Sequence, residues 1–262
     1  MSQRSLRLKA RLAGGEVAVG AWLTVPDAAV AEIMAGTGYD FVLIDTEHAP
    51  WSLESLQMAM LAFRGVDTVP IVRVPWNDHV HVKQALDLGA EGIVAPMVRT
   101  TEEARALLAA CRYPPEGSRG FGPRRASAYG RDTDAYVAMA NRGVIVIPQL
   151  EDVRTVAEID AILALEGIDA LCIGPNDLSG SVGAMRRHDH PVVVDAIERT
   201  LAAARTLGIA VCAGFTLPAE RQAAWVERGA RMLLVASDVE LLARGASEAL
   251  AGARVAFPVR GG

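Results

Sequence analysis

Short apolar runs and longer amphipathic stretches alternate along this chain eight times. In the longer stretches apolar residues recur every three or four positions, the spacing of an α-helix that buries one face. The short runs are apolar at consecutive positions, which is typical of strands buried on both faces in a parallel sheet. The predicted strands are Val17–Leu23, Phe41–Ile44, Val69–Arg73, Gly92–Ala95, Val144–Gln149, Ala170–Ile173, Ile209–Ala213 and Met232–Val235. The predicted helices are Ala28–Ala35, Leu53–Phe63, Val80–Leu88, Thr101–Ala110, Val153–Leu165, Val192–Leu207, Pro218–Glu227 and Val239–Ala251.

Glycine marks the joint between several of these helices and the strand that follows. Leu88-Gly89 and Leu207-Gly208 each place a glycine at a helix end, directly before an apolar run. Glycine takes the left-handed conformation that ends a helix without steric cost, so these joints are short turns. Strands and helices alternating in this way predict an α/β fold, a (β/α)8 TIM barrel forming a single domain over residues 1–262. The alternative is a doubly wound open sheet, but its glycine-rich first turn is missing after Val17–Leu23.

Polar residues gather where the predicted strands end, at the edge of the barrel where active sites of this fold are built. The strand that ends at Ile44 is followed directly by Asp45, Glu47 and His48, three residues that can titrate or bind a metal. The next strand ends in Arg73, whose planar fork can hold a carboxylate or a developing oxyanion. Arg73 can also form a salt bridge to Asp45 or Glu47, and the two roles are compatible.

Two carboxylates follow adjacent predicted strands. Glu151 stands just past Val144–Gln149, and Asp177 stands just past Ala170–Ile173. Such a pair can bind a hard divalent cation such as Mg²⁺ or Mn²⁺, which keeps further positions for substrate oxygens. The alternative is that Glu151 begins a helix and Asp177 caps the next one.

Composition limits the kinds of partner and compartment. The chain has 262 residues, 51% of them hydrophobic, and a formal net charge of −5, which gives no electrostatic footprint for nucleic acid. No apolar run reaches the roughly 20 residues needed to cross a membrane. The basic N-terminus, Met1 to Glu16, lacks the apolar core of a signal peptide. Three scattered cysteines favour a reducing cytoplasm over a disulfide framework. We therefore expect a cytoplasmic protein with a small-molecule partner.

One long loop departs from the pattern of short turns. Tyr113–Arg131 is rich in glycine, proline and arginine, and long loops in compact domains are usually functional or disordered. Its four arginines would suit an anionic substrate, although a solvated surface loop explains them equally well.

Six motifs, in order, resemble those of a known family over essentially the whole chain. The family is that of the HpcH/HpaI aldolases, which are metal-dependent (class II) pyruvate aldolases. The motifs are Leu43-Ile44-Asp45-Thr46-Glu47-His48-Ala49-Pro50, Arg73-Val74-Pro75-Trp76-Asn77-Asp78, Val94-Ala95-Pro96-Met97-Val98, Arg112-Tyr113-Pro114-Pro115-Glu116-Gly117-Ser118-Arg119-Gly120, Gln149-Leu150-Glu151 and Ile173-Gly174-Pro175-Asn176-Asp177-Leu178-Ser179.

The resemblance implies a role for each site residue. Glu151 and Asp177 would hold a divalent metal ion (Mg²⁺ or Mn²⁺, with Co²⁺ a further candidate) that chelates pyruvate, and Arg73 would stabilise the enolate oxygen. His48, paired with Asp87, would relay the proton of the aldol hydroxyl. The residues implied to line the substrate pocket are Trp22, Gln149, Gly174, Pro175 and Asn176. The segment Phe121–Ala128, which borders the site in the family, is spaced differently here, so the aldehyde partner stays open.

The chemistry agrees with this assignment. Forming an enolate requires an electron sink, and aldolases without a metal use a lysine iminium. The only lysines are Lys9 and Lys83, and neither stands at the carboxyl end of a strand. The negative charge must therefore go to a metal and to Arg73.

We therefore expect a lyase that reversibly cleaves a 4-hydroxy-2-oxo acid to pyruvate and an aldehyde. The alternatives are a related lyase or decarboxylase acting on oxaloacetate-like substrates, or a non-catalytic barrel that binds an oxoacid. The resemblance also implies a homo-oligomer, a hexamer in which the helix Val239–Ala251 is swapped between neighbouring subunits. The apolar residues Leu242 and Leu250 of that helix fit such a contact.

Overall fold

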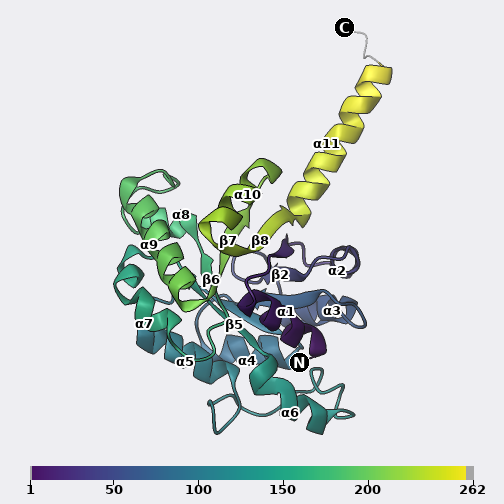
Figure 1. The fold of residues 1–262 in the computed structure, drawn as a ribbon. Helices are drawn as coiled ribbons and strands as arrows, with labels where there is room; N and C mark the ends of the chain where they lie inside the picture. Colours follow the sequence, from purple (N-terminus) through teal and green to yellow (C-terminus); the bar gives the residue numbers. More distant parts are fainter. Residues whose placement is uncertain (1, 258–262) are drawn as a thin grey trace.

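The computed structural model describes residues 2–257 and contains a closed barrel of eight parallel strands with helices around it (Figure 1). The strands are β1 (Ala18–Leu23), β2 (Phe41–Asp45), β3 (Val69–Arg73), β4 (Gly92–Ala95), β5 (Ile145–Leu150), β6 (Ala170–Ile173), β7 (Ala210–Thr216) and β8 (Ala230–Ser237), and they pair in chain order, with β8 returning to β1. The (β/α)8 barrel predicted from the sequence is confirmed, and the open sheet is wrong.

The helices agree with the predicted pattern apart from a few additions. They are α1 (Gln3–Ala13), α2 (Ala28–Gly36), α3 (Leu53–Ala62), α4 (His79–Asp87), α5 (Thr101–Cys111), α6 (Thr133–Gly143), the 3₁₀ helix η1 (Val153–Glu158), α7 (Ile159–Leu163), α8 (Pro175–Gly180), α9 (Pro191–Leu207), α10 (Ala219–Arg228) and α11 (Asp238–Ala256). The sequence pattern missed α1, α6 and α8, and the single helix predicted over Val153–Leu165 is divided into η1 and α7.

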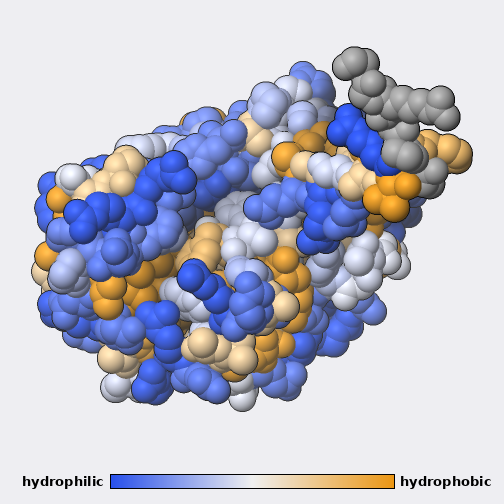
Figure 2. Space-filling view, turned by 90° about the horizontal axis from the view of Figure 1, so that it is seen from above, coloured by the Kyte–Doolittle hydropathy of each residue, from blue (hydrophilic) through white to orange (hydrophobic). Residues whose placement is uncertain are grey.

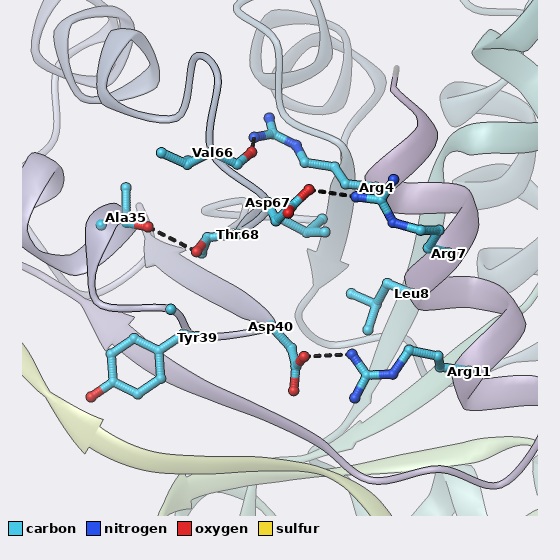
Figure 3. Close-up of a pocket in the computed structure, with 13 residues that line it drawn as sticks. Arg4, Arg7, Leu8, Arg11, Ala35, Tyr39, Asp40, Val66, Asp67 and Thr68 are labelled. Atoms are coloured by element: carbon cyan, nitrogen blue, oxygen red, sulfur yellow. Dashed lines mark hydrogen bonds and ion pairs between the residues drawn. The ribbon is translucent and has the colours of Figure 1, made fainter.

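Helix α1 closes the lower end of the barrel, away from the strands' carboxyl ends. Its Leu8 and Leu12 are buried in the same apolar cluster as the inward-facing residues of the strands. Around them Arg7 forms an ion pair with Asp67 and Arg11 forms one with Asp40, at the edge of a cavity of about 370 Å³ (Figure 3). The charges at this end are largely paired within the chain.

The opposite, upper end is open, since Figure 2 shows a hollow near the centre of this face with hydrophilic residues around much of its rim. The carboxyl ends of the strands lead to this face, which is where the sequence placed the chemistry.

Helix α11 extends away from the barrel instead of packing on it (Figure 1). Leu242 is 70% exposed and Leu250 is 52% exposed. On the barrel wall, Val19 of β1 faces outward and is exposed. Among residues 2–257, therefore, Leu242 and Leu250 of α11 and part of the outer face of β1 are left exposed. The subunit swap predicted for this helix is compatible with that shape and stays a prediction.

Within residues 2–257, no helix is long and apolar enough to cross a membrane.

Candidate active site

Arg73 and Asp45 form a buried pair at the carboxyl ends of β3 and β2. The two residues stand opposite each other in the strand register. Arg73 donates from Nε to Asp45 Oδ1 at 2.9 Å and from Nη2 to Asp45 Oδ2 at 2.7 Å, a two-pronged contact that fixes the plane of the guanidinium. The ring of Trp22 on β1 lies under that plane, 4.6 Å from Arg73 Cζ. The salt bridge considered from the sequence is therefore present.

The pairing with Asp45 uses only two of the three guanidinium nitrogens of Arg73, Nε and Nη2. Burial opposes ionisation of Asp45, but Arg73 outweighs it and lowers the pKa of that carboxyl. The third nitrogen of the guanidinium, Nη1, donates no hydrogen bond to any described residue. Arg73 is therefore fixed at the mouth of the barrel with Nη1 not engaged by the described residues.

Glu151 is held in place by two hydrogen bonds at the end of β5. Gln149 Nε2 donates to its Oε1 at 2.7 Å, and the backbone N–H of Met97 donates to its Oε2 at 2.8 Å. Met97 follows β4 in the left-handed region, at φ 55°, which is uncommon for a residue with a side chain and is typical of functional sites. Each carboxylate oxygen thus retains capacity for one more contact.

Gly174, three residues before Asp177, lets the start of α8 pack directly against Glu151. Asp177 lies in the first turn of α8, and its carboxylate accepts no hydrogen bond from the described residues. A Cβ on Gly174 would lie 2.7 Å from Glu151 Cγ and 2.8 Å from Gln149 Nε2, so only glycine fits between these two elements. Pro175 is buried at the first position of α8, while Asn176 is exposed and its Oδ1 lies 2.8 Å from His188 Nε2.

Neither carboxylate acts as the helix cap considered from the sequence. Asp152, not Glu151, caps η1 through a hydrogen bond from the backbone N–H of Arg154. The cap position of α8 is Gly174. Neither acid is therefore needed as a helix cap.

The donor set fits a hard divalent cation. Burial, more than any other cause, raises the pKa of Glu151 to about 7; the bond from Met97 opposes the rise, and Glu47 and Asp177 add to it. These carboxylates therefore lie close enough to repel one another, and a bound cation would relieve that repulsion. The residues that the structure describes contain no group of three or more side chains close enough to ligate a single ion. The chain offers two carboxylates, which leaves room for substrate oxygens.

Comparison with known proteins identifies the family. The family model described as HpcH/HpaI aldolase/citrate lyase matches residues 18–245. The chain belongs to the HpcH/HpaI aldolase/citrate lyase family. It is 40% identical over 246 residues to a 4-hydroxy-2-oxo-heptane-1,7-dioate aldolase of Salmonella paratyphi A, covering 93% of this chain and 92% of that protein.

Two further relatives agree with this placement. The chain is 39% identical over 236 residues to a hydroxypyruvate/pyruvate aldolase of Roseobacter denitrificans, covering 89% of this chain and 91% of that protein. The crystal structure of a family member from Burkholderia cenocepacia J2315 superposes with a TM-score of 0.87 at 36% identity, covering 95% of this chain and 99% of that one. The resemblance found in the six sequence motifs is confirmed.

The structure does not bring His48 and Asp87 together within one chain. His48 follows β2 at the mouth, with its side chain 61% exposed. Asp87 ends α4, which runs from the carboxyl end of β3 to the lower end of the barrel, and its Oδ1 accepts a hydrogen bond of 2.6 Å from Arg119 Nη2. A contact between His48 and Asp87 would have to join two copies of the chain, and their pairing stays a prediction.

The long loop after α5 also lies at the lower end. Its Ala126 donates to the backbone carbonyl of Asp87, and Arg125 donates to the carbonyls of Met60 and Leu88 at the ends of α3 and α4. Its arginines therefore do not line the mouth of their own barrel.

The sequence placed Glu47 in the polar cluster and offered it as a salt-bridge partner of Arg73, but assigned it no part in the reaction. In the structure its Oε2 is buried and has no hydrogen-bond partner among the described residues. It lies 3.3 Å from Arg73 Nε and 3.7 Å from His48 Nε2. The position directly after a buried strand was the available signal, but the sequence could not show which oxygens are buried.

Proposed function

We propose that this protein is a metal-dependent carbon–carbon lyase that reversibly cleaves a 4-hydroxy-2-oxo acid to pyruvate and an aldehyde. The observation that carries the proposal is the fixed edge of Arg73 beside the carboxylates of Glu151 and Asp177. Such cleavage leaves negative charge on the oxo oxygen of the pyruvate half. A preorganised guanidinium and a bound cation at the same mouth would stabilise that negative charge.

Glu151 and Asp177 would hold the divalent cation, Mg²⁺ or Mn²⁺, because both are oxygen donors on adjacent strand ends. When bound, that ion supplies Lewis-acid stabilisation of the charge on the oxo oxygen. Gln149 orients Glu151 through its 2.7 Å hydrogen bond, and Gly174 leaves space for the carboxylate. Together they fix the geometry of the cation site.

Arg73 binds the oxo oxygen and stays charged and oriented through Asp45 and Trp22. His48, exposed at the mouth, takes the proton from the C4 hydroxyl as the C3–C4 bond breaks and later releases it to solvent. The enolate that remains takes up a proton at C3 from solvent to give pyruvate, and addition runs these steps in reverse. A histidine suits this exchange because its ordinary pKa lies near neutrality. Asn176 and Pro175, next to Asp177, lie where they can bound the substrate pocket.

The active protein is a homo-oligomer, which we propose to be a hexamer joined through α11. The support is that Leu242 and Leu250 of this helix are exposed among the residues that the structure describes. The compartment is the cytoplasm, since Cys111, Cys172 and Cys212 are all buried free thiols.

The test is pyruvate release, coupled to lactate dehydrogenase, from a panel of 4-hydroxy-2-oxo acids and oxaloacetate, with and without EDTA. We expect release from the hydroxy-oxo acids that EDTA abolishes and Mg²⁺ or Mn²⁺ restores. The Asp177→Ala variant, folded by circular dichroism, should be inactive. Release that persists after EDTA treatment in that variant would exclude the proposed mechanism, and release from oxaloacetate alone would favour the decarboxylase.

A further inference from the structure

Glu47 is a half-buried acid in the mouth whose charge Arg73 matches only in part. It follows β2, its side chain is 14% exposed, and its Oε2 is buried without a hydrogen-bond partner among the described residues. An unpaired buried charge is costly unless a cation or hydrogen-bond donors compensate it.

Arg73 cannot supply the full compensation. Its Nε lies 3.3 Å from Glu47 Oε2, but the hydrogen bonds of Nε and Nη2 go to Asp45. The charge of Arg73 is thus already matched by one acid, and Glu47 is a second. His48 lies 3.7 Å from the same Oε2 but is mostly exposed to solvent.

The other charged neighbours of Glu47 are acids. Burial is the largest cause that raises the pKa of Glu47 to about 7; Arg73 opposes the rise, while Asp45 and Asp177 add to it. Glu47 in turn raises the pKa of Glu151. The charge of Glu47 therefore acts on both carboxylates of the cation site.

We propose that Glu47 is the third carboxylate of the cation site, a positioning residue that strengthens divalent-cation binding without being a direct ligand. The inference rests on the proposed function, because it takes Glu151 and Asp177 as the ligands.

Its outer position follows from the strand order. Glu151 and Asp177 follow the neighbouring strands β5 and β6, whereas Glu47 follows β2 on another part of the barrel wall. No three acids or histidines of the described chain are close enough to bind one ion together. Glu47 therefore acts on the cation through its charge. Residues that support metal ligands in this way typically change metal affinity by about 10–100-fold.

The experiment measures Mn²⁺ binding to the full-length, metal-stripped protein in the absence of substrate, by isothermal titration calorimetry and by electron paramagnetic resonance of free Mn²⁺. Glu47→Gln keeps the size of the side chain and removes its charge, so we expect the Kd to rise by about 10-fold or more. Glu47→Asp keeps the charge and should retain most of the affinity.

The matched control is Glu54→Gln, which also removes one negative charge but from an exposed residue at the start of α3. Its charge is screened by salt, so its Kd should stay within about twofold of the parent value. A Kd for Glu47→Gln that stays equally close to the parent would overturn the proposal. Absence of Mn²⁺ binding in the unmodified protein would instead count against the cation site of the proposed function.

Discussion

The guanidinium of Arg73 and the carboxylate of Asp45 meet edge to edge, with two hydrogen bonds of 2.9 and 2.7 Å at the ends of adjacent strands. Both residues are buried, at 8% and 4% exposure. A buried carboxylate that holds an arginine by both prongs leaves that arginine little freedom to rotate. The pair thus acts as a rigid donor, and its geometry is already set before a substrate binds.

Replacing Arg73 by lysine tests this rigidity. Lysine keeps the positive charge beside Asp45 but loses the planar fork and the edge that faces the mouth. We expect kcat for cleavage to fall by about 10²–10³-fold, the usual loss when an oxyanion donor is removed. Deuterium exchange into the pyruvate methyl group, followed by proton NMR, should fall by a similar factor because the same oxygen is stabilised in both reactions.

The control for this substitution is Arg154→Lys. Arg154 is paired with Asp152 at the protein surface and lies on η1. Its replacement should leave both rates near those of the parent. Wild-type exchange in Arg73→Lys, together with lost cleavage, would contradict a role for Arg73 at the enolate oxygen.

The acids of the cation site give the metal-free protein a defined pH dependence. The pKa values of Glu47 and Glu151 are raised from 4.5 to about 7. An acid whose folded pKa is raised binds more protons in the folded state than in the unfolded state. The free energy of unfolding should therefore fall as the pH rises from about 4.5 to about 7.

A divalent cation should reverse this trend, because it stabilises the ionised carboxylates. We expect Mg²⁺ to raise the melting temperature more at pH 7.5 than at pH 5, measured by differential scanning fluorimetry at constant ionic strength. Asp177→Ala should lose most of the Mg²⁺ effect. An equal rise at both pH values, or an unchanged rise in Asp177→Ala, would argue against a cation at these carboxylates.

Gly174 allows a third test of the cation site. In Gly174→Ala the new Cβ would lie 2.7 Å from Glu151 Cγ, in a crowded and buried position, so Glu151 must move. We expect weaker Mn²⁺ binding and lower kcat with the secondary structure retained by circular dichroism. The control is Gly36→Ala, whose new Cβ would meet open space, so its Mn²⁺ affinity and kcat should equal those of the parent. Gly180→Ala is unsuitable as a control because its new Cβ would clash with Met185. Equal Mn²⁺ affinity in Gly174→Ala and the parent would show that Glu151 tolerates the shift.

The fold was readable from the sequence because β2 to β6 are buried on both faces and most of the longer helices have one apolar face. The pairing of Glu151 with Asp177 was predicted for a related reason, since both follow strands that adjoin in chain order, and it stays a prediction. The burial of Glu47 Oε2 in the loop after β2 could not be read from the sequence. Glu47 was therefore assigned no part in the reaction or in metal binding. The short helix α8 was missed because six residues are too few for a helical period to show in the sequence.

Asp87 shows another limit of sequence reasoning. Its role came from the resemblance alone, and the structure places it at the far end of α4, bonded to Arg119. The spacing of residues in one chain cannot reveal a contact that needs a second copy. The same limit applies to α11. Its exposed apolar residues indicate that something covers the helix, but the sequence does not show what does so.

Oligomerisation through α11 can be tested by a single substitution. Leu242 is 70% exposed in one chain, so Leu242→Asp should not disturb the barrel itself. If a neighbouring subunit covers this residue, the buried charge should dissociate the oligomer, which light scattering after size exclusion would detect as a fall toward 27.8 kDa. Met185→Asp, at a residue that is 62% exposed outside α11, is the control and should keep the parent mass. A parent protein that runs as a monomer would exclude the hexamer.

His48 divides the proposed reaction into two halves. Enolisation of pyruvate depends on the cation site and Arg73, whereas carbon–carbon cleavage also needs a group that takes the proton from the C4 hydroxyl. His48 is 61% exposed at the mouth, so His48→Ala should leave the fold and Mn²⁺ binding intact. Cleavage should fall by about 10²–10⁴-fold, the usual contribution of a general acid or base.

Exchange of the pyruvate methyl protons should fall less than cleavage in His48→Ala, because no C4 hydroxyl takes part in exchange. Both rates can be followed on one sample by proton NMR. His79→Ala, which removes an exposed histidine at the start of α4, is the matched control and should leave both rates unchanged. Equal losses of exchange and cleavage in His48→Ala would mean that His48 also serves enolisation, and the division of roles between His48 and Arg73 would then be wrong.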